Sequence, residues 1–182
     1  MSTRLTLHAA PAAGFDEPFE MLLGCHERVE RMLGLLERLA AHLDTHGCDD
    51  AARQAAQDVM RYFDLAGPAH HEDEERHVLP LLAAGPDAAL QALAQRLRQD
   101  HRAMTEQWRA VRADLAGVAD GRWPAAPDAA RAARWRGYAA LYRDHVRAEE
   151  AHAFPAARAR LDADAQAAMG HEMAARRGAA KA

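Results

Sequence analysis

Apolar residues recur at intervals of three and four along most of the chain, a spacing that places them on one face of an α-helix. Four long series of this kind run through residues 16–46, 49–83, 86–118 and 127–158, and a shorter one runs through residues 163–176. The breaks between the long series, "THGCDD", "AAGPDA" and "AGVADGRWPAAPD", combine Gly or Pro with Asp, residues that end one helix and cap the next. The pattern predicts an all-α fold: an up-down-up-down four-helix bundle with a short appended C-terminal helix.

Histidine and glutamate interrupt the apolar faces at a few positions. Each long series contains a histidine in line with its apolar residues, and in two series a glutamate follows that histidine four residues later. Three residues further, the same two series continue through His77 and His152. Because residues four apart lie on the same side of a helix, these glutamates share the faces of the histidines. A single histidine in such a position is most often a core residue, but four on four facing helices are not explained that way. The six residues are His26, His70, Glu74, His101, His145 and Glu149.

These six residues predict a pair of metal ions. A buried carboxylate without a partner is strongly unfavourable, so two of them inside one bundle need a cation. Imidazole nitrogen and carboxylate oxygen suit iron, manganese or zinc, and the two cysteines, Cys25 and Cys48, lack the spacing of a thiolate site. If both glutamates bridge, the six ligands fill about four positions on each ion, which leaves places for a bridging oxygen and a small external ligand.

Two copies of one motif carry a resemblance to a known family. The stretches "HHEDEERHVLP" (70–80) and "HVRAEEAHAFP" (145–155) share the spacing H-x-x-x-E-E-x-x-x-x-P. Together with "CHERVERML" and "QDHRAM", which contain the other two histidines, they make the chain resemble the hemerythrin-like HHE cation-binding domain family over roughly residues 15–157. The resemblance implies that the six residues hold two non-haem iron ions, which an oxo or hydroxo group joins. It also implies a protein that binds or reacts with O₂ or NO in sensing, detoxification or iron handling.

The chain departs from the oxygen-carrying members of that family at Thr105. Those proteins have a further histidine one turn after the ligand on the third helix, and here that position is Thr105. The chain is therefore similar to the subgroup with four histidines and two glutamates. This subgroup includes bacterial iron-sulfur-centre repair proteins, but their Cys-containing N-terminal domain does not occur in this sequence. With one ligand fewer, we expect the centre to favour irreversible oxidation over reversible oxygen carriage.

Some assignments stay open at this point. His71 and Glu75 form a second pair with the same spacing, turned by about 100° around the helix. The apolar residues that precede the motif favour His70 and Glu74 over this pair, and the other polar residues of the turn, including Asp73, are then expected on the flank or in solvent. No role is assigned to three residues near the motifs, which are His77, His152 and Tyr142.

Composition and charge exclude some classes of partner. The net charge is −4 and no block of basic residues occurs, so a nucleic-acid partner is not expected. No apolar run is long enough to span a membrane, and the N-terminus lacks the apolar core of a signal peptide, so we expect no membrane partner and a cytoplasmic location. The expected organisation is an N-terminal arm (1–14), a hemerythrin-like HHE domain (15–158) and a C-terminal helix and tail (159–182).

Two other functions compete with the di-iron hypothesis. An iron-gated regulatory or partner-binding bundle needs an exposed apolar patch on the helix at 163–176, where only Met169 and Met173 qualify. A structural bundle, metal-free or zinc-bound, is excluded if the protein binds ferrous iron at about two ions per chain. The sequence identifies no protein partner, reductase or oligomeric state, and it leaves open whether the protein is an enzyme.

Overall fold

The computed structural model describes residues 14–123 and 128–178, and every regular element in these ranges is a helix. The all-α prediction is therefore confirmed. The predicted N-terminal arm lies almost wholly outside the described residues. The elements are α1 (Pro18–His46), α2 (Asp50–His77), α3 (Leu79–Ala84), α4 (Ala88–Ala119), α5 (Ala129–Ala148), the π-helical turn η1 (Glu149–Ala153), α6 (Phe154–Arg158) and α7 (Ala163–Arg176).

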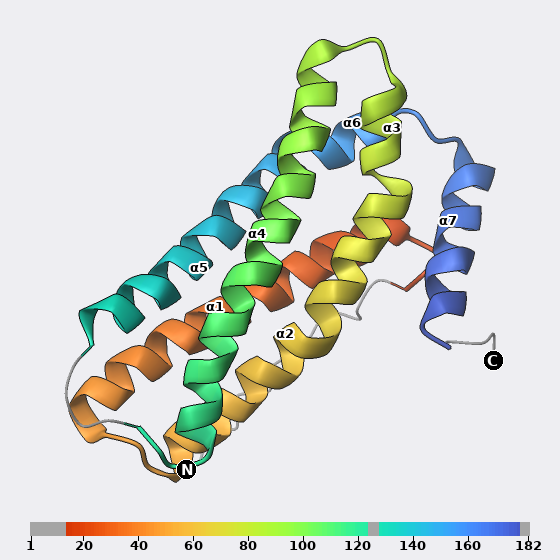
Figure 1. Ribbon diagram of the computed structural model, residues 1–182. Helices are drawn as coiled ribbons and strands as arrows, with labels where there is room; N and C mark the ends of the chain where they lie inside the picture. The colour runs from red at the N-terminus through yellow and green to blue at the C-terminus, as the bar shows by residue number, and fades with distance from the viewer. Residues whose placement is uncertain (1–13, 124–127, 179–182) are drawn as a thin grey trace, which may run out of the picture.

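Four long helices, α1, α2, α4 and α5, form the bundle (Figure 1). α1 packs against α2 and α5, and α4 packs against the same two helices, so the four close around a shared interior. Short connections make consecutive helices antiparallel, as an up-down-up-down bundle requires. α3 and α6 prolong α2 and α5 at one end of the bundle, and α7 turns back to pack against α1.

Side-chain caps fix where most of these helices begin. The carboxylate of an aspartate accepts a hydrogen bond from a backbone N–H in the first turn of α2, α4, α5 and α7. α1 has no such cap and begins with Pro18, whose missing N–H would have no helical partner there. The four capping residues are Asp49, Asp87, Asp128 and Asp162. The first three lie in the breaks where the sequence predicted that an Asp caps the next helix.

The second predicted helix is interrupted, so a continuous helix over residues 49–83 was wrong. α2 ends at His77 and α3 begins at Leu79, with Val78 between them. Pro80 explains the break, because proline has no backbone N–H and its ring clashes with the carbonyl four residues earlier. On α3, Leu79 and Leu82 are fully buried, whereas Leu81 is only partly buried.

The fourth predicted helix contains the π-helical turn η1. A π turn holds one more residue than an α-helical turn, so the residues after it are shifted around the helix axis. Ala153 and Phe154 are therefore buried, whereas His152, which the spacing had placed on the apolar face, is exposed. Pro155 follows directly and begins a new α-helical segment.

The buried apolar residues form two clusters, one on either side of the middle of the bundle. The first core cluster fills the half that contains the connection between α1 and α2, and the second lies under α3, α6 and α7. α7 contributes Met169 and Met173 to the second cluster, so these residues are buried in the fold. Gly170 lies between them, and its lack of a side chain permits close approach to the Phe15 carbonyl, since a Cβ would lie 1.8 Å from that oxygen.

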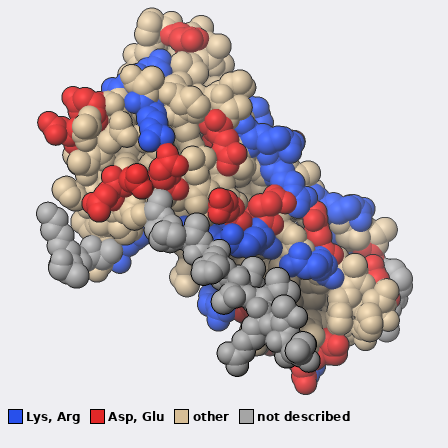
Figure 2. Space-filling model, turned by 180° about the vertical axis from the view of Figure 1, so that it is seen from behind, with Lys and Arg blue, Asp and Glu red and all other residues tan. Residues whose placement is uncertain are grey.

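The surface carries charges of both signs. On the face drawn in Figure 2, the basic and acidic side chains are intermingled and do not gather into one large basic patch. Within the described residues, no helix combines the length and apolar character that crossing a membrane requires.

Candidate metal centre

The six polar residues singled out from the sequence come together in the middle of the bundle. Each lies between the first and the second core cluster, and none exposes more than 4% of its surface. On α1, for example, His26 is preceded by Leu22 of the second cluster and followed by Val29 of the first. The six are His26 on α1, His70 and Glu74 on α2, His101 on α4, His145 on α5 and Glu149 at the start of η1.

One group of four donors lies between α1, α2 and η1. His26, His70, Glu74 and Glu149 each offer an atom within 4.8 Å of the others. His70 Nε2 is 3.1 Å from Glu74 Oε1, and His26 Nε2 is 3.2 Å from Glu149 Oε2. Neighbouring donors of an octahedral ion bound at about 2.1 Å lie about 3 Å apart, so this spacing suits one ion.

A second group shares both glutamates with the first. Glu74, His101, His145 and Glu149 again offer atoms within 4.8 Å of one another. His101 Nε2 is 3.4 Å from Glu74 Oε2, and His145 Nε2 is 3.0 Å from Glu149 Oε1. Each glutamate therefore turns one oxygen toward each histidine pair, which is the arrangement that two bridging carboxylates need.

The hydrogen-bonding state of the donors also favours a cation. Both carboxylate oxygens of Glu74 and of Glu149 are buried and have no hydrogen-bond partner in the described part of the chain, and the same holds for His26 Nε2. His101 Nε2 and His145 Nε2 approach to 3.1 Å, although two unprotonated ring nitrogens would repel each other at that distance. A positive ion between these atoms satisfies all of them at once.

In three of the four histidines, a carboxylate lies near Nδ1, the ring nitrogen that faces away from the centre. His26 Nδ1 lies 3.0 Å from Glu150 Oε1, His101 Nδ1 lies 3.0 Å from Glu75 Oε1, and His145 Nδ1 lies 3.4 Å from Asp100 Oδ2. Such a contact places the ring proton on Nδ1, so Nε2 presents its lone pair to the centre and the ring is held in orientation.

These carboxylates were not recognised from the sequence. Glu75 had been considered only as part of a competing ligand pair or as a solvated residue. The sequence does contain a feature that could have indicated two of them, because both motif copies have two successive glutamates, Glu74 with Glu75 and Glu149 with Glu150. In each copy the first glutamate faces both histidine pairs, and the second contacts a histidine on another helix.

The charges of the centre stabilise each other strongly. Burial alone lowers the pKa of His26, but pairing with Glu149 and Glu74 outweighs burial and raises this pKa to about 9. For His145 the opposing effects are burial and the negative charge of Glu149, and the pKa is again raised to about 9. Burial raises the pKa of Glu74, but the positive His70 and the contacts with His101 and His26 hold it well below its ordinary value. A metal ion that binds here must displace protons from imidazoles.

The fourth histidine, His70, has a thiol beside it in place of a carboxylate. Burial raises the pKa of Cys25, but His70 and Arg28 outweigh burial and lower it. Arg28 Nη2 donates to Cys25 Sγ at 3.0 Å, whereas no well-aligned hydrogen bond joins His70 Nδ1 to the sulfur.

The two possible pairs of the first motif lie in different surroundings. His70 and Glu74 face the other donors, whereas Glu75 is exposed and its carboxylate reaches the back of His101. His71 lies with its ring stacked on that of His101, at 4.1 Å between centroids and 12° between planes. Burial lowers the pKa of His71 well below its ordinary value, so this ring is neutral.

The prediction that Asp73 lies on the flank or in solvent was wrong. It is fully buried, and its carboxylate accepts hydrogen bonds from Arg176 and Arg177 at the end of α7. His77, one turn further along α2, pairs with Glu172 of α7 at 2.6 Å. The acidic turn that contributes Glu74 to the centre therefore also binds the C-terminal helix.

Of the remaining residues near the motifs, Tyr142 packs in the core and His152 does not. Tyr142 is buried, and burial raises its pKa above its ordinary range. Its ring lies 5.8 Å from that of His71 and 5.4 Å from that of Phe63. His152 faces solvent beyond the π turn.

Comparison with known proteins gives a family match and a relative. Residues 17–157 match the family described as the hemerythrin HHE cation binding domain. An uncharacterized protein of Haemophilus influenzae is 34% identical over 104 residues, which are 57% of this chain. The matched region covers 59% of that relative's length.

Proposed function

The chain belongs to the hemerythrin HHE cation-binding family, and we propose that it is a non-haem di-iron protein that binds or reacts with O₂ or NO. In this proposal the ligands of one ion are His26 and His70, those of the other are His101 and His145, and both glutamates bridge. The observation that carries it is the placement of two fully buried carboxylates, without hydrogen-bond partners in the described residues, between two pairs of imidazole nitrogens. Two iron ions bound there supply Lewis acidity and one-electron redox chemistry.

The side chains around the donors give the centre its properties. Glu75, Glu150 and Asp100 hold three imidazole rings in one orientation and keep the Nε2 lone pairs directed inward. The two core clusters exclude bulk water from both ends of the centre. Thr105 has no imidazole nitrogen to offer, and its hydroxyl donates to the His101 carbonyl at 2.9 Å. Four donor residues per ion leave a position for an external ligand, which supports reaction with O₂ or NO in sensing, detoxification or iron handling in the cytoplasm.

An iron-gated regulatory or partner-binding bundle has less support. That function requires an exposed apolar patch on α7, and the two residues considered for it, Met169 and Met173, are buried in the second core cluster.

The test is an absorption spectrum of protein loaded anaerobically with ferrous iron, recorded while O₂ is admitted and then removed. We expect about two iron ions per chain and a new near-ultraviolet band that persists until a reductant is added. A band that disappears on removal of O₂ would mean reversible carriage instead of irreversible oxidation. A protein that takes up zinc but no ferrous iron would refute the di-iron proposal.

A further inference from the structure

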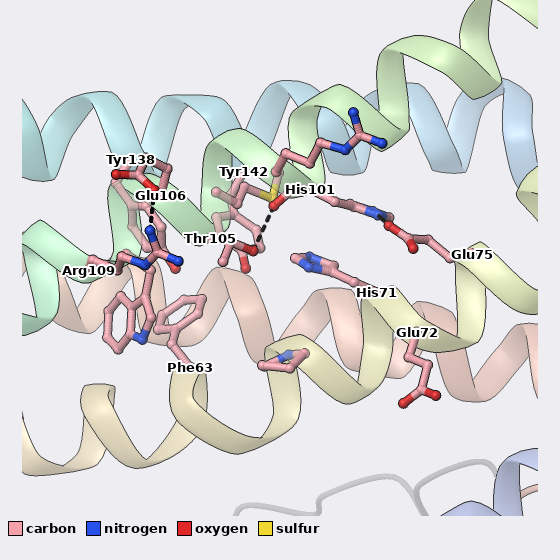
Figure 3. Close-up of a pocket in the computed structure, with 14 residues that line it drawn as sticks. Phe63, His71, Glu72, Glu75, His101, Thr105, Glu106, Arg109, Tyr138 and Tyr142 are labelled. Atoms are coloured by element: carbon pink, nitrogen blue, oxygen red, sulfur yellow. Dashed lines mark hydrogen bonds and ion pairs between the residues drawn. The ribbon is translucent and has the colours of Figure 1, made fainter.

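A cavity of about 480 Å³ opens between α2 and α4 and reaches the centre from one side. Aromatic rings form part of its apolar wall, including those of Phe63, Tyr138 and Tyr142, and Figure 3 shows Thr105 close to Tyr142. The lining includes His101, one of the six donors, and His71, whose ring stacks on that of His101. The cavity therefore adjoins the half of the centre that contains His101 and His145, and it is far larger than one water, which occupies about 30 Å³.

One fully buried polar atom of the cavity lining has no hydrogen-bond partner in the described residues. His71 Nε2 is buried and makes no hydrogen bond within the described residues. Two nearby polar groups of the lining are engaged with the protein: the Thr105 hydroxyl donates to the His101 carbonyl at 2.9 Å, and Trp108 Nε1 donates to Asp64 at 2.9 Å. A buried ring nitrogen without a partner is unfavourable, so a molecule that enters the cavity and hydrogen-bonds His71 gains binding energy.

Ring geometry shows that His71 does not bind the same ion as His101. An imidazole directs its nitrogen lone pair within the plane of the ring. The rings of His71 and His101 are nearly parallel, with 12° between their planes, and are stacked with centroids 4.1 Å apart. Two stacked parallel rings cannot both point their lone pairs at one ion. His71 would therefore not be a ligand of the ion that His101 would hold, and its Nε2 is left for a molecule in the cavity.

A second hollow, of about 830 Å³, reaches the centre on the opposite side and is lined by His26. It differs in the state of its polar groups. His26 Nδ1 is hydrogen-bonded to Glu150 Oε1, and His26 Nε2 faces Glu149 Oε2. None of its other lining residues carries a buried polar atom without a partner. This hollow therefore offers an external ligand no buried unsatisfied hydrogen-bonding group besides His26 itself.

We propose that external ligands reach the ion held by His101 and His145 through the cavity between α2 and α4, and that His71 Nε2 hydrogen-bonds them there. The ligand class is a small molecule that binds a metal through one atom and presents a second polar atom to His71, as O₂, NO and the azide ion do. The inference rests on the proposed di-iron function, and it specifies which ion reacts and by which route.

The test uses azide as the probe and iron-loaded, air-oxidised protein, with binding followed by absorption. His71→Leu keeps an apolar side chain of similar size but cannot hydrogen-bond. We expect the azide Kd to rise about tenfold, which corresponds to losing one hydrogen bond to a charged ligand. His71→Gln restores a hydrogen-bonding group and should recover part of the affinity. Both variants should keep the iron content of the wild type, because His71 is not a ligand in this proposal.

The route is tested by two matched substitutions of exposed residues. Thr105→Trp fills the cavity between α2 and α4, and Arg31→Trp fills the hollow beside His26. We expect the first to slow azide association at least about tenfold and the second to leave it unchanged. If Arg31→Trp slows azide association and Thr105→Trp does not, or if His71→Leu binds azide as the wild type does, the inference is overturned while the di-iron function stays intact. A wild-type protein that binds iron but no azide would overturn it too, whereas one that binds no iron would overturn the proposed function itself.

Discussion

Replacing Glu75 with Gln removes the charge behind His101 and leaves all six proposed ligands in place. Glu75 Oε1 lies 3.0 Å from His101 Nδ1, and the Glu75 side chain is 48% exposed. A hydrogen bond to a charged group contributes about 1.5–3 kcal/mol when buried, and solvent screening at a half-exposed carboxylate reduces this value. Glutamine can still accept a hydrogen bond through its amide oxygen. We therefore expect a loss of about 1.4 kcal/mol, or about tenfold in metal affinity.

Competition with a chelator for ferrous iron under anaerobic conditions measures this loss. The effect should fall on the ion between His101 and His145, so Glu75→Gln should titrate in two steps where the wild type titrates in one. Glu72→Gln is the matched control, because Glu72 lies on the same turn and pairs with Arg76 and Arg176 but contacts none of the four histidines.

Glu150→Gln provides the mirror experiment on the other ion. Glu150 Oε1 lies 3.0 Å from His26 Nδ1, and its side chain is 45% exposed, close to the value for Glu75. The two variants should therefore weaken different ions by similar factors. If both bind two irons with wild-type affinity, or if Glu72→Gln weakens binding equally, the carboxylates behind the histidines do not tune the centre and the reasoning fails.

Three further predictions concern the ligands, the protons and the C-terminal helix. Glu74→Ala should release both ions together, whereas His101→Ala should lower iron content only in part, as elemental analysis of the purified variants will show. The pKa of His26 and of His145 is raised from 6.5 to about 9, so their protonation stabilises the metal-free protein fully below pH 6.5 and this contribution is lost as the pH rises through about 9. Denaturant titration of metal-free protein should therefore give a free energy of unfolding that falls by roughly 3 kcal/mol or more between pH 6 and pH 9.5, a decrease that iron loading abolishes. Asp73→Asn removes the buried charge that the arginines of α7 bind, so it should cost about 2–4 kcal/mol of stability and make α7 cleavable in limited proteolysis, and an unchanged cleavage pattern would contradict this role.

The helices and the proposed ligands were predictable because both depend on local spacing. Positions three and four apart share a helix face whatever the rest of the chain does. The four histidines and two glutamates stood on those faces, and the structure brings all six within one buried cluster. Where the chain leaves regular α-helical geometry, this reasoning failed. It placed His152 on the apolar face, because counting by three and four does not anticipate the extra residue of the π turn.

Burial of Asp73 and the contacts of Glu75 could not be derived from spacing, because they depend on residues far away in sequence. Asp73 is buried by arginines more than 100 positions later, which the fold brings alongside α2 only when α7 docks. Glu75 binds a histidine 26 positions away, on α4. Both residues look like members of a solvated acidic run until the partner helices are in place.

The two motif copies hold the isolated histidines of α1 and α4 in the same way. His101 has Glu75 at its Nδ1 and the ring of His71 stacked on its face, both from α2. His26 has Glu150 at its Nδ1 and the ring of Phe154 stacked on its face at 5.2 Å and 13°, both from the segment that follows α5.

The stacked rings differ in one respect that packing does not require. Phe154 shows that an apolar ring is sufficient to hold a histidine in this fold, so holding His101 does not by itself call for an imidazole at position 71. The imidazole at that position carries a buried nitrogen without a hydrogen-bond partner in the described residues, and it lines the cavity that reaches the centre. Because an unsatisfied buried nitrogen destabilises the fold, its presence is best explained by a molecule that binds it during function.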